Sequence, residues 1–179
     1  MLTSSGDSAT LAAHFGLALC YAQFINPVGG PEAVATYLRR FRPSATLATP
    51  KASVGIFAFC SEDPAKVKDI RALVDYRLLS FEKGRYDETP TIAAATDYQY
   101  TPAEYQRVLF NRERTAIGTP GELREKLVSL ATAFGVDELV LSTFTEEAED
   151  RIHSYELLAE MFALRPREIP NFNGQLPAQ

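Results

Sequence analysis

The chain has 179 residues, of which 46% are hydrophobic and 23% charged, and this length allows one domain with a single core. Its formal net charge of -5 argues against a nucleic-acid binder, because nucleic-acid phosphates require a basic surface. No apolar run reaches the roughly 20 residues that cross a bilayer, and the start lacks the basic and apolar regions of a signal peptide, so we expect a cytoplasmic protein. Cys20 and Cys60 lie in apolar runs without metal-ligand spacing, which predicts reduced core thiols and no metal site.

The first ten residues combine a short apolar stub with small hydroxyl residues and the start of a helix at about 9–15. Ser5 and Ser8 can offer hydroxyls, and the turn around Gly6 can offer backbone N–H groups, beside the positive end of the helix dipole. This arrangement predicts a cradle for an anion such as a phosphate. The alternative is that the serines of this segment and Asp7 only cap the helix.

The rest of the chain alternates short apolar runs with amphipathic helical segments, which predicts an α/β fold. The run 52–60 is apolar almost throughout and suits a parallel strand that is covered on both faces. Thr119 and Glu122 have the capping-box spacing before a helix that Gly135 ends. In chain order the expected strands are 17–25, 52–60 and 136–144, and the expected helices are 31–41, 63–81, 123–134 and 149–162.

Residues 84–101 show no sustained period, and three tyrosines and one proline lie there among polar residues. We expect an irregular loop, which either covers a binding site or is disordered. Helical spacing resumes at Tyr105. Beyond it, Arg107, Arg112 and Arg114 are expected to face water, the alternative being a guanidinium near a bound phosphate.

The order and spacing of six segments resemble the C-terminal half of the bacterial luciferase-like, flavin-dependent monooxygenases. The resemblance covers most of the chain, from Leu2 to about Glu160. Its clearest pieces are Ser4-Ser5-Gly6-Asp7-Ser8-Ala9, Ala12-Ala13-His14-Phe15-Gly16-Leu17, Tyr37-Leu38-Arg39-Arg40-Phe41-Arg42-Pro43, Ile117-Gly118-Thr119-Pro120, Gly135-Val136-Asp137-Glu138-Leu139 and Ser154-Tyr155-Glu156-Leu157-Leu158-Ala159-Glu160. The fold it implies is a (β/α) TIM barrel, of which residues 1–165 would form about strands 5–8, followed by an extended tail at 166–179.

The resemblance also implies that the chain binds reduced FMN (FMNH2) at the carboxyl ends of the strands. Ser5 and Ser8 would hold the phosphate with the backbone of Gly6 and Asp7. Ser4 would also bind the cofactor, although it stands where luciferases proper carry an acidic residue. The strand ends would form a pocket for the flavin ring or the organic substrate, with core packing as the alternative for the aromatic residues. The residues expected in this pocket are Tyr21, Gln23, Phe24, Asn26, Phe57 and Phe59.

The activity that the resemblance implies is a monooxygenase reaction, in which reduced FMN and O2 oxygenate a small organic substrate. The histidine that assists this chemistry in the family belongs to the N-terminal half, so the catalytic residue is unknown here. The alternatives are a non-catalytic FMN-binding protein and a subunit that completes a partner barrel. Because a half-barrel leaves strand edges unpaired, we expect a homodimer, completion by an N-terminal half on a second polypeptide, or a sequence that is a segment of a longer chain.

Overall fold

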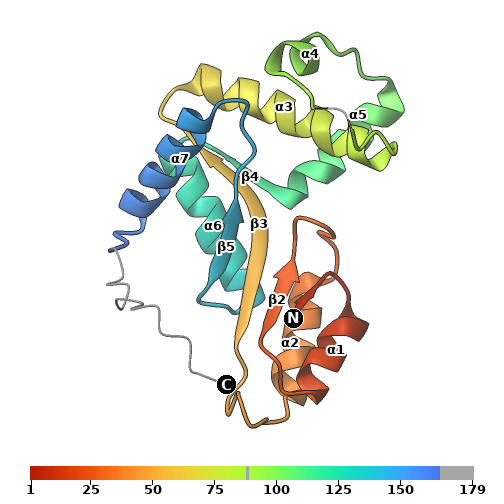
Figure 1. Ribbon diagram of the computed structural model, residues 1–179, viewed down its shortest axis with the longest axis vertical. Helices are drawn as coiled ribbons and strands as arrows, with labels where there is room; N and C mark the ends of the chain where they lie inside the picture. Colours follow the sequence, from red (N-terminus) through yellow and green to blue (C-terminus); the bar gives the residue numbers. More distant parts are fainter. Residues whose placement is uncertain (88, 166–179) are drawn as a thin grey trace, which may run out of the picture.

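The computed structural model describes residues 1–87 and 89–165 (Figure 1). The strands in these residues are β1 (Leu2–Thr3), β2 (Leu19–Ala22), β3 (Ala52–Cys60), β4 (Thr115–Gly118) and β5 (Leu139–Ser142). The helices are α1 (Gly6–His14), α2 (Gly30–Arg40), α3 (Pro64–Glu82), α4 (Ile92–Asp97), α5 (Pro102–Asn111), the 3-10 helix η1 (Arg112–Arg114), α6 (Pro120–Phe134) and α7 (Ala148–Met161). Within the described ranges no helix is long and apolar enough to cross a membrane.

The expected elements are present, and most have shifted ends. The strand at 52–60 is confirmed over its whole length, whereas β2 and β5 occupy only the central residues of the runs expected at 17–25 and 136–144. The capping box of α6 is confirmed, because the Glu122 carboxylate accepts the backbone N–H of Thr119 at 2.9 Å, and Gly135 ends the helix with a φ of 63°. β4 has no counterpart among the expected strands.

The segment expected as an irregular loop, 84–101, contains the short helix α4. This helix begins where the Thr91 hydroxyl accepts the backbone N–H of Ala94, a cap that satisfies one free N–H group of the first turn. The expected C-terminal tail, 166–179, lies outside the described residues.

All strand pairs in the sheet are parallel. Val54 and Gly55 of β3 pair with both β2 and β5, so these two strands lie on opposite edges of β3. Phe57 pairs with both β4 and β5, which places β4 on the same edge as β2, beyond the end of β2. Strands β1, β2, β3 and β5 are therefore consecutive neighbours, and β4 extends the sheet at the carboxyl end of β3.

Side chains alternate along β3 and divide the core into two layers. Ile56, Ala58 and Cys60 pack against α6 and α7, and Val54 belongs to a cluster with α1 and α2. Phe59 faces the other way, into a cluster with the apolar face of α3. Figure 1 shows α3 lying across the carboxyl end of β3.

The face of the sheet opposite α1, α2, α6 and α7 is open in its middle part. Leu2 is 58% exposed and Val140 is 48% exposed. Through the strand register Leu2 is level with Cys20, and Val140 is level with Gly55, so both side chains lie on this open face. The outer edges of β1 and β5 have no strand partner among the described residues. The result is a parallel half-barrel with helices on its outer side and an accessible inner side.

Candidate functional site: a turn at the start of the first helix

The N-terminal turn, residues 4–8, connects β1 to α1 at the carboxyl edge of the sheet. Ser5 is the N-cap of α1, and its Oγ accepts the backbone N–H of Ser8 at 3.3 Å. The Ser5 hydroxyl also donates to the Ser8 hydroxyl at 3.2 Å. The capping role is therefore confirmed. It leaves other N–H groups of the first turn free for a ligand, because the first four of a helix have no intrahelical partner.

Two side chains, one from β2 and one from the loop after it, donate hydrogen bonds to the backbone of this turn. The Asn26 amide donates to the Ser4 carbonyl at 3.0 Å, and its oxygen accepts the N–H of Val28 at 3.0 Å. The Tyr21 hydroxyl lies 3.0 Å from the Val28 carbonyl and 3.4 Å from the Ser4 carbonyl. Burial, helped by the charge of Glu32, raises the pKa of this hydroxyl and keeps it a neutral donor. Tyr21 and Asn26 thus fix the position of the turn relative to β2 and the loop after it.

The remaining residues expected at the strand ends fall into two groups. Phe24 and Phe57 lie together on the inner side of the sheet, with 5.2 Å between ring centroids, and Phe57 also contacts Phe144. Phe59 is 1% exposed and packs in the core against α3. Gln23 is buried, and its amide nitrogen donates to the Glu113 carbonyl at 3.1 Å, whereas its side-chain oxygen has no hydrogen-bond partner among the described residues.

The expectation that these arginines face water is confirmed for Arg107, which is 48% exposed, and is wrong for Arg112 and Arg114, which are 34% and 12% exposed. Arg107 and Arg114 donate to Glu82 at 2.8 and 2.7 Å, and Arg112 donates to Asp75 at 2.8 Å. Both carboxylates belong to α3. The partners lie 25 to 37 residues from their arginines in the sequence, so no local spacing could have indicated these pairs.

Arg114 connects three parts of the fold near the N-terminal turn. Its side chain is only 12% exposed, and besides Glu82 it donates to the Asn111 side chain at 3.0 Å. Its Nε donates to the Phe24 carbonyl at 3.1 Å, in the loop after β2 that also carries Asn26. This arginine joins the excursion, which is the segment 83–114 between α3 and β4, to the loop that supports the turn.

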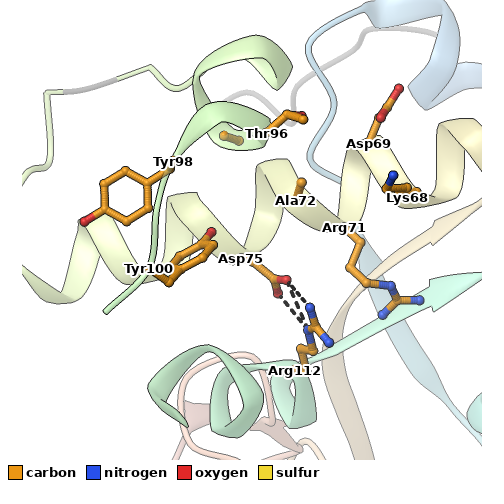
Figure 2. Close-up of a pocket in the computed structure, with 10 residues that line it drawn as sticks. Lys68, Asp69, Arg71, Ala72, Asp75, Thr96, Tyr98, Tyr100 and Arg112 are labelled. Atoms are coloured by element: carbon orange, nitrogen blue, oxygen red, sulfur yellow. Dashed lines mark hydrogen bonds and ion pairs between the residues drawn. The ribbon is translucent and has the colours of Figure 1, made fainter. Parts of the chain in front are cut away.

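Two cavities lie away from the N-terminal turn. One is a surface hollow at the other end of α1, lined by Thr10, His14, Arg40 and Arg42. The other, between α3 and α4, is shown in Figure 2. Over the described ranges no three His, Cys, Asp or Glu side chains come together as metal ligands.

Known proteins are similar to this chain over about half of their own length. The uncharacterized protein YwcH of Bacillus subtilis (strain 168) is 38% identical over 164 residues, which are 91% of this chain and 49% of that protein. A luciferase-like monooxygenase of Escherichia coli (strain K12) is 25% identical over 161 residues, or 90% of this chain and 48% of that one. The crystal structure of apo-MsnO8 has a TM-score of 0.82 and 30% sequence identity, and the match covers 93% of this chain and 51% of that one. No family model matches the chain.

The chain belongs to the luciferase-like family. The parallel order β1, β2, β3, β5 with helices on its outer side is that of a (β/α) TIM barrel, of which this chain forms a half. In such barrels ligands bind at the carboxyl ends of the strands. The N-terminal turn of this luciferase-like half-barrel lies at that end.

Proposed function

We propose that this luciferase-like half-barrel is part of an FMN-dependent monooxygenase and that its N-terminal turn holds the phosphate of the flavin. The observation that carries the proposal is the open turn at the amino end of α1, where Ser5, Gly6 and Asp7 are exposed at the carboxyl edge of a parallel sheet. The resemblance to proteins named luciferase-like monooxygenase supports this function.

The residues of the turn fit a phosphate group. A Cβ at Gly6 would meet nothing within 4 Å, so a ligand can approach the backbone here. The serine hydroxyls and the free N–H groups of a nine-residue helix favour an anion. Asp7 contributes a negative charge to the turn, and its side chain is exposed, where water screens the charge.

Reduced FMN, when bound, supplies the reaction with O2 that oxygenates a small organic substrate. The part of this chain would be to bind the phosphate and to provide apolar surface beside the ring. Phe24 and Phe57 lie on the inner side of the sheet and suit the second role. Asn26 and Tyr21 would keep the turn in position through the Ser4 carbonyl. We assign no catalytic base to this chain.

An anaerobic titration with reduced FMN tests the phosphate site. We expect micromolar binding, which Ser5→Ala with Ser8→Ala weakens at least tenfold, or about 1.4 kcal/mol. Ser5→Asp separates binding from capping, because aspartate is a good N-cap but repels a phosphate. We expect Ser5→Asp to keep the stability of the protein and to lose flavin affinity. Full affinity in Ser5→Asp would show that the turn is only a helix cap.

A second candidate is a flavin-binding protein without turnover. The open inner face favours it, because a site that water enters does not protect reactive flavin chemistry, and Leu2 and Val140 are half exposed there. O2 consumption by the FMN-loaded protein distinguishes the two functions. Binding with substrate-dependent O2 uptake supports a monooxygenase, and binding without it supports the second candidate.

We also propose that a second half-barrel covers the inner face, either as a second copy of this chain or as an N-terminal half on another polypeptide. The outer edges of β1 and β5, which have no strand partner among the described residues, support the need for a cover. Apolar side chains are also exposed on the inner face, where Leu2 and Val140 are 58% and 48% exposed. Exposed apolar patches of this kind mark interaction surfaces.

Sedimentation of the Val140→Asp variant tests whether a second copy of the chain covers the inner face. If two copies pair, we expect the unaltered chain to sediment as a dimer and Val140→Asp as a monomer. Val128→Asp on the outer face of α6, where Val128 is 43% exposed, is the matched control and should stay dimeric. A monomer without any substitution would exclude closure by a second copy.

A further inference from the structure

A cavity of about 250 Å³ lies between α3, α4 and η1, and none of its lining residues belongs to the N-terminal turn. Figure 2 shows lining residues on α3, on α4 with the segment after it, and Arg112 on η1. Its apolar walls are Ala72, Ala95 and the rings of Tyr98 and Tyr100. A space of this size suits a small molecule of one ring or a short chain.

The charges that line the cavity do not balance. Asp75 is committed to Arg112, whose Nη2 and Nε donate to one carboxylate oxygen at 2.8 and 3.1 Å. The remaining charged side chains of the lining are Lys68, Arg71 and Asp69, which leave one positive charge in excess. Arg71 lies on α3 and donates to the Ile117 carbonyl. A ligand with one negative charge would neutralise this lining.

Tyr100 supplies the second observation. Its hydroxyl is buried beside the Asp75–Arg112 pair and has no hydrogen-bond partner among the described residues. Burial, with the nearby Asp75 charge, raises the pKa of Tyr100 to about 12, so the hydroxyl keeps its proton and can donate it. A buried hydroxyl without a partner is costly and rare in proteins. An acceptor atom of a ligand in the cavity would satisfy it.

We propose that this cavity binds a small organic acid with an aromatic or short aliphatic body. Its carboxylate accepts the Tyr100 hydroxyl and is attracted by the positive lining, and its body packs against Ala72, Ala95 and the tyrosine rings. The site takes its ligand independently of flavin, since it shares no residue with the N-terminal turn. A weak affinity is expected for a small acid in a partly open cavity.

Saturation-transfer NMR on the full chain tests the site with benzoate as the probe, and benzamide serves as its neutral isostere. We expect benzoate to bind at least tenfold more tightly than benzamide. Tyr100→Phe removes one hydroxyl and keeps the ring, and we expect it to weaken benzoate binding at least fivefold. Tyr86→Phe is the matched control, because Tyr86 is 67% exposed and does not line the cavity. It should leave the affinity unchanged.

A charge variant gives a second, independent readout. Lys68→Gln should weaken benzoate and leave benzamide unaffected, whereas Lys51→Gln, at an exposed ion pair with Glu138, should change neither. Equal binding of benzoate and benzamide, no binding of either, or unaltered affinity in Tyr100→Phe would each overturn the proposal. Inorganic phosphate that competes as strongly as benzoate would also overturn it, because the apolar walls would then have no role.

Discussion

The barrel elements and the excursion, residues 83–114 between α3 and β4, are held in place by different interactions. The barrel elements pack through apolar side chains from both strands and helices, such as Ile56, Leu127 and Leu158. The excursion packs Ile92 against the apolar face of α3 and is in addition joined to α3 by ion pairs of Arg107 and Arg112. A repeating apolar pattern therefore builds the scaffold, whereas single ion pairs help to place the segment that overlies its carboxyl end.

The largest effect is expected in the barrel. Ile56→Ala removes a side chain that is 1% exposed between β3, α6 and α7. The lost contacts and the cavity should lower the free energy of unfolding by about 2–5 kcal/mol, measured by urea unfolding with circular dichroism. Val128→Ala on the exposed side of α6 should change it by less than about 0.5 kcal/mol. Equal effects would mean that the barrel core is not where the stability lies.

Asp75→Asn should have the next largest effect, and it should be confined to the excursion. The Asp75 side chain is 7% exposed and Arg112 is 34% exposed, so the variant leaves a partly buried cation without its carboxylate. We expect a cost of about 2 kcal/mol, below the range for fully buried pairs because water reaches the arginine. Hydrogen exchange should accelerate in α5 and η1. The same acceleration in β2 and β3 would contradict the separation of the two regions.

A smaller effect is expected from Glu82→Gln. Glu82 accepts hydrogen bonds from Arg107, Arg114 and Asn111. Burial raises its pKa, but these hydrogen bonds and the two arginine charges outweigh burial and lower it overall. Loss of the charge should cost about 1 kcal/mol, because Arg107 is half exposed. High salt should reduce the difference between the variant and the unaltered protein in hydrogen exchange of α5. A difference that salt does not change would argue against an electrostatic attachment.

The smallest effect is expected from the cluster around Glu104, and it depends on pH. Hydrogen bonds from Lys83, the Thr101 backbone and Tyr98 lower the pKa of Glu104 to about 2 from its ordinary 4.5. A lowered carboxyl pKa stabilises the fold above about pH 4.5 and loses that contribution as the pH falls towards 2. Tyrosine fluorescence should report loosening of the excursion in this window.

Glu104→Gln should flatten that acid transition. Glu125→Gln is its control, because Glu125 is exposed on α6 and no ion pair joins it to another described residue. If the variant and the unaltered protein have the same acid transition, the ion pair between Lys83 and Glu104 does not keep α5 attached to the end of α3. A shift in the control alone would assign the transition to another carboxylate.

Much of the half-barrel could be predicted because its signals are local. The apolar run at 52–60 indicated β3, and the spacing from Thr119 to Glu122 with Gly135 bounded α6. β4 was missed because its four residues, Thr115–Gly118, are too few to show the alternation of apolar and polar side chains that distinguishes a strand from a loop. α4 was missed for a similar reason, since its six residues, Ile92–Asp97, make fewer than two helical turns.

The candidate site was predicted only in part. The hydroxyl turn at Ser5 and Ser8 could be read from adjacent residues, and so could its capping role. The support of that turn by Tyr21 and Asn26 could not, because it joins groups 17 and 22 residues apart. The same holds for Arg114 and the Phe24 carbonyl, which are 90 residues apart.

The sequence by itself determined the order of most strands and helices, the caps that bound several of them, and the small hydroxyl turn before α1. These features follow from backbone hydrogen bonding and from apolar periodicity within a few residues. Only the tertiary structure decided which carboxylate each arginine binds, that α3 buries Phe59 while Phe57 on the same face of β3 stays partly exposed, and that Tyr100 lines a cavity. Those outcomes depend on distances between segments far apart in the chain, and no local pattern encodes such distances.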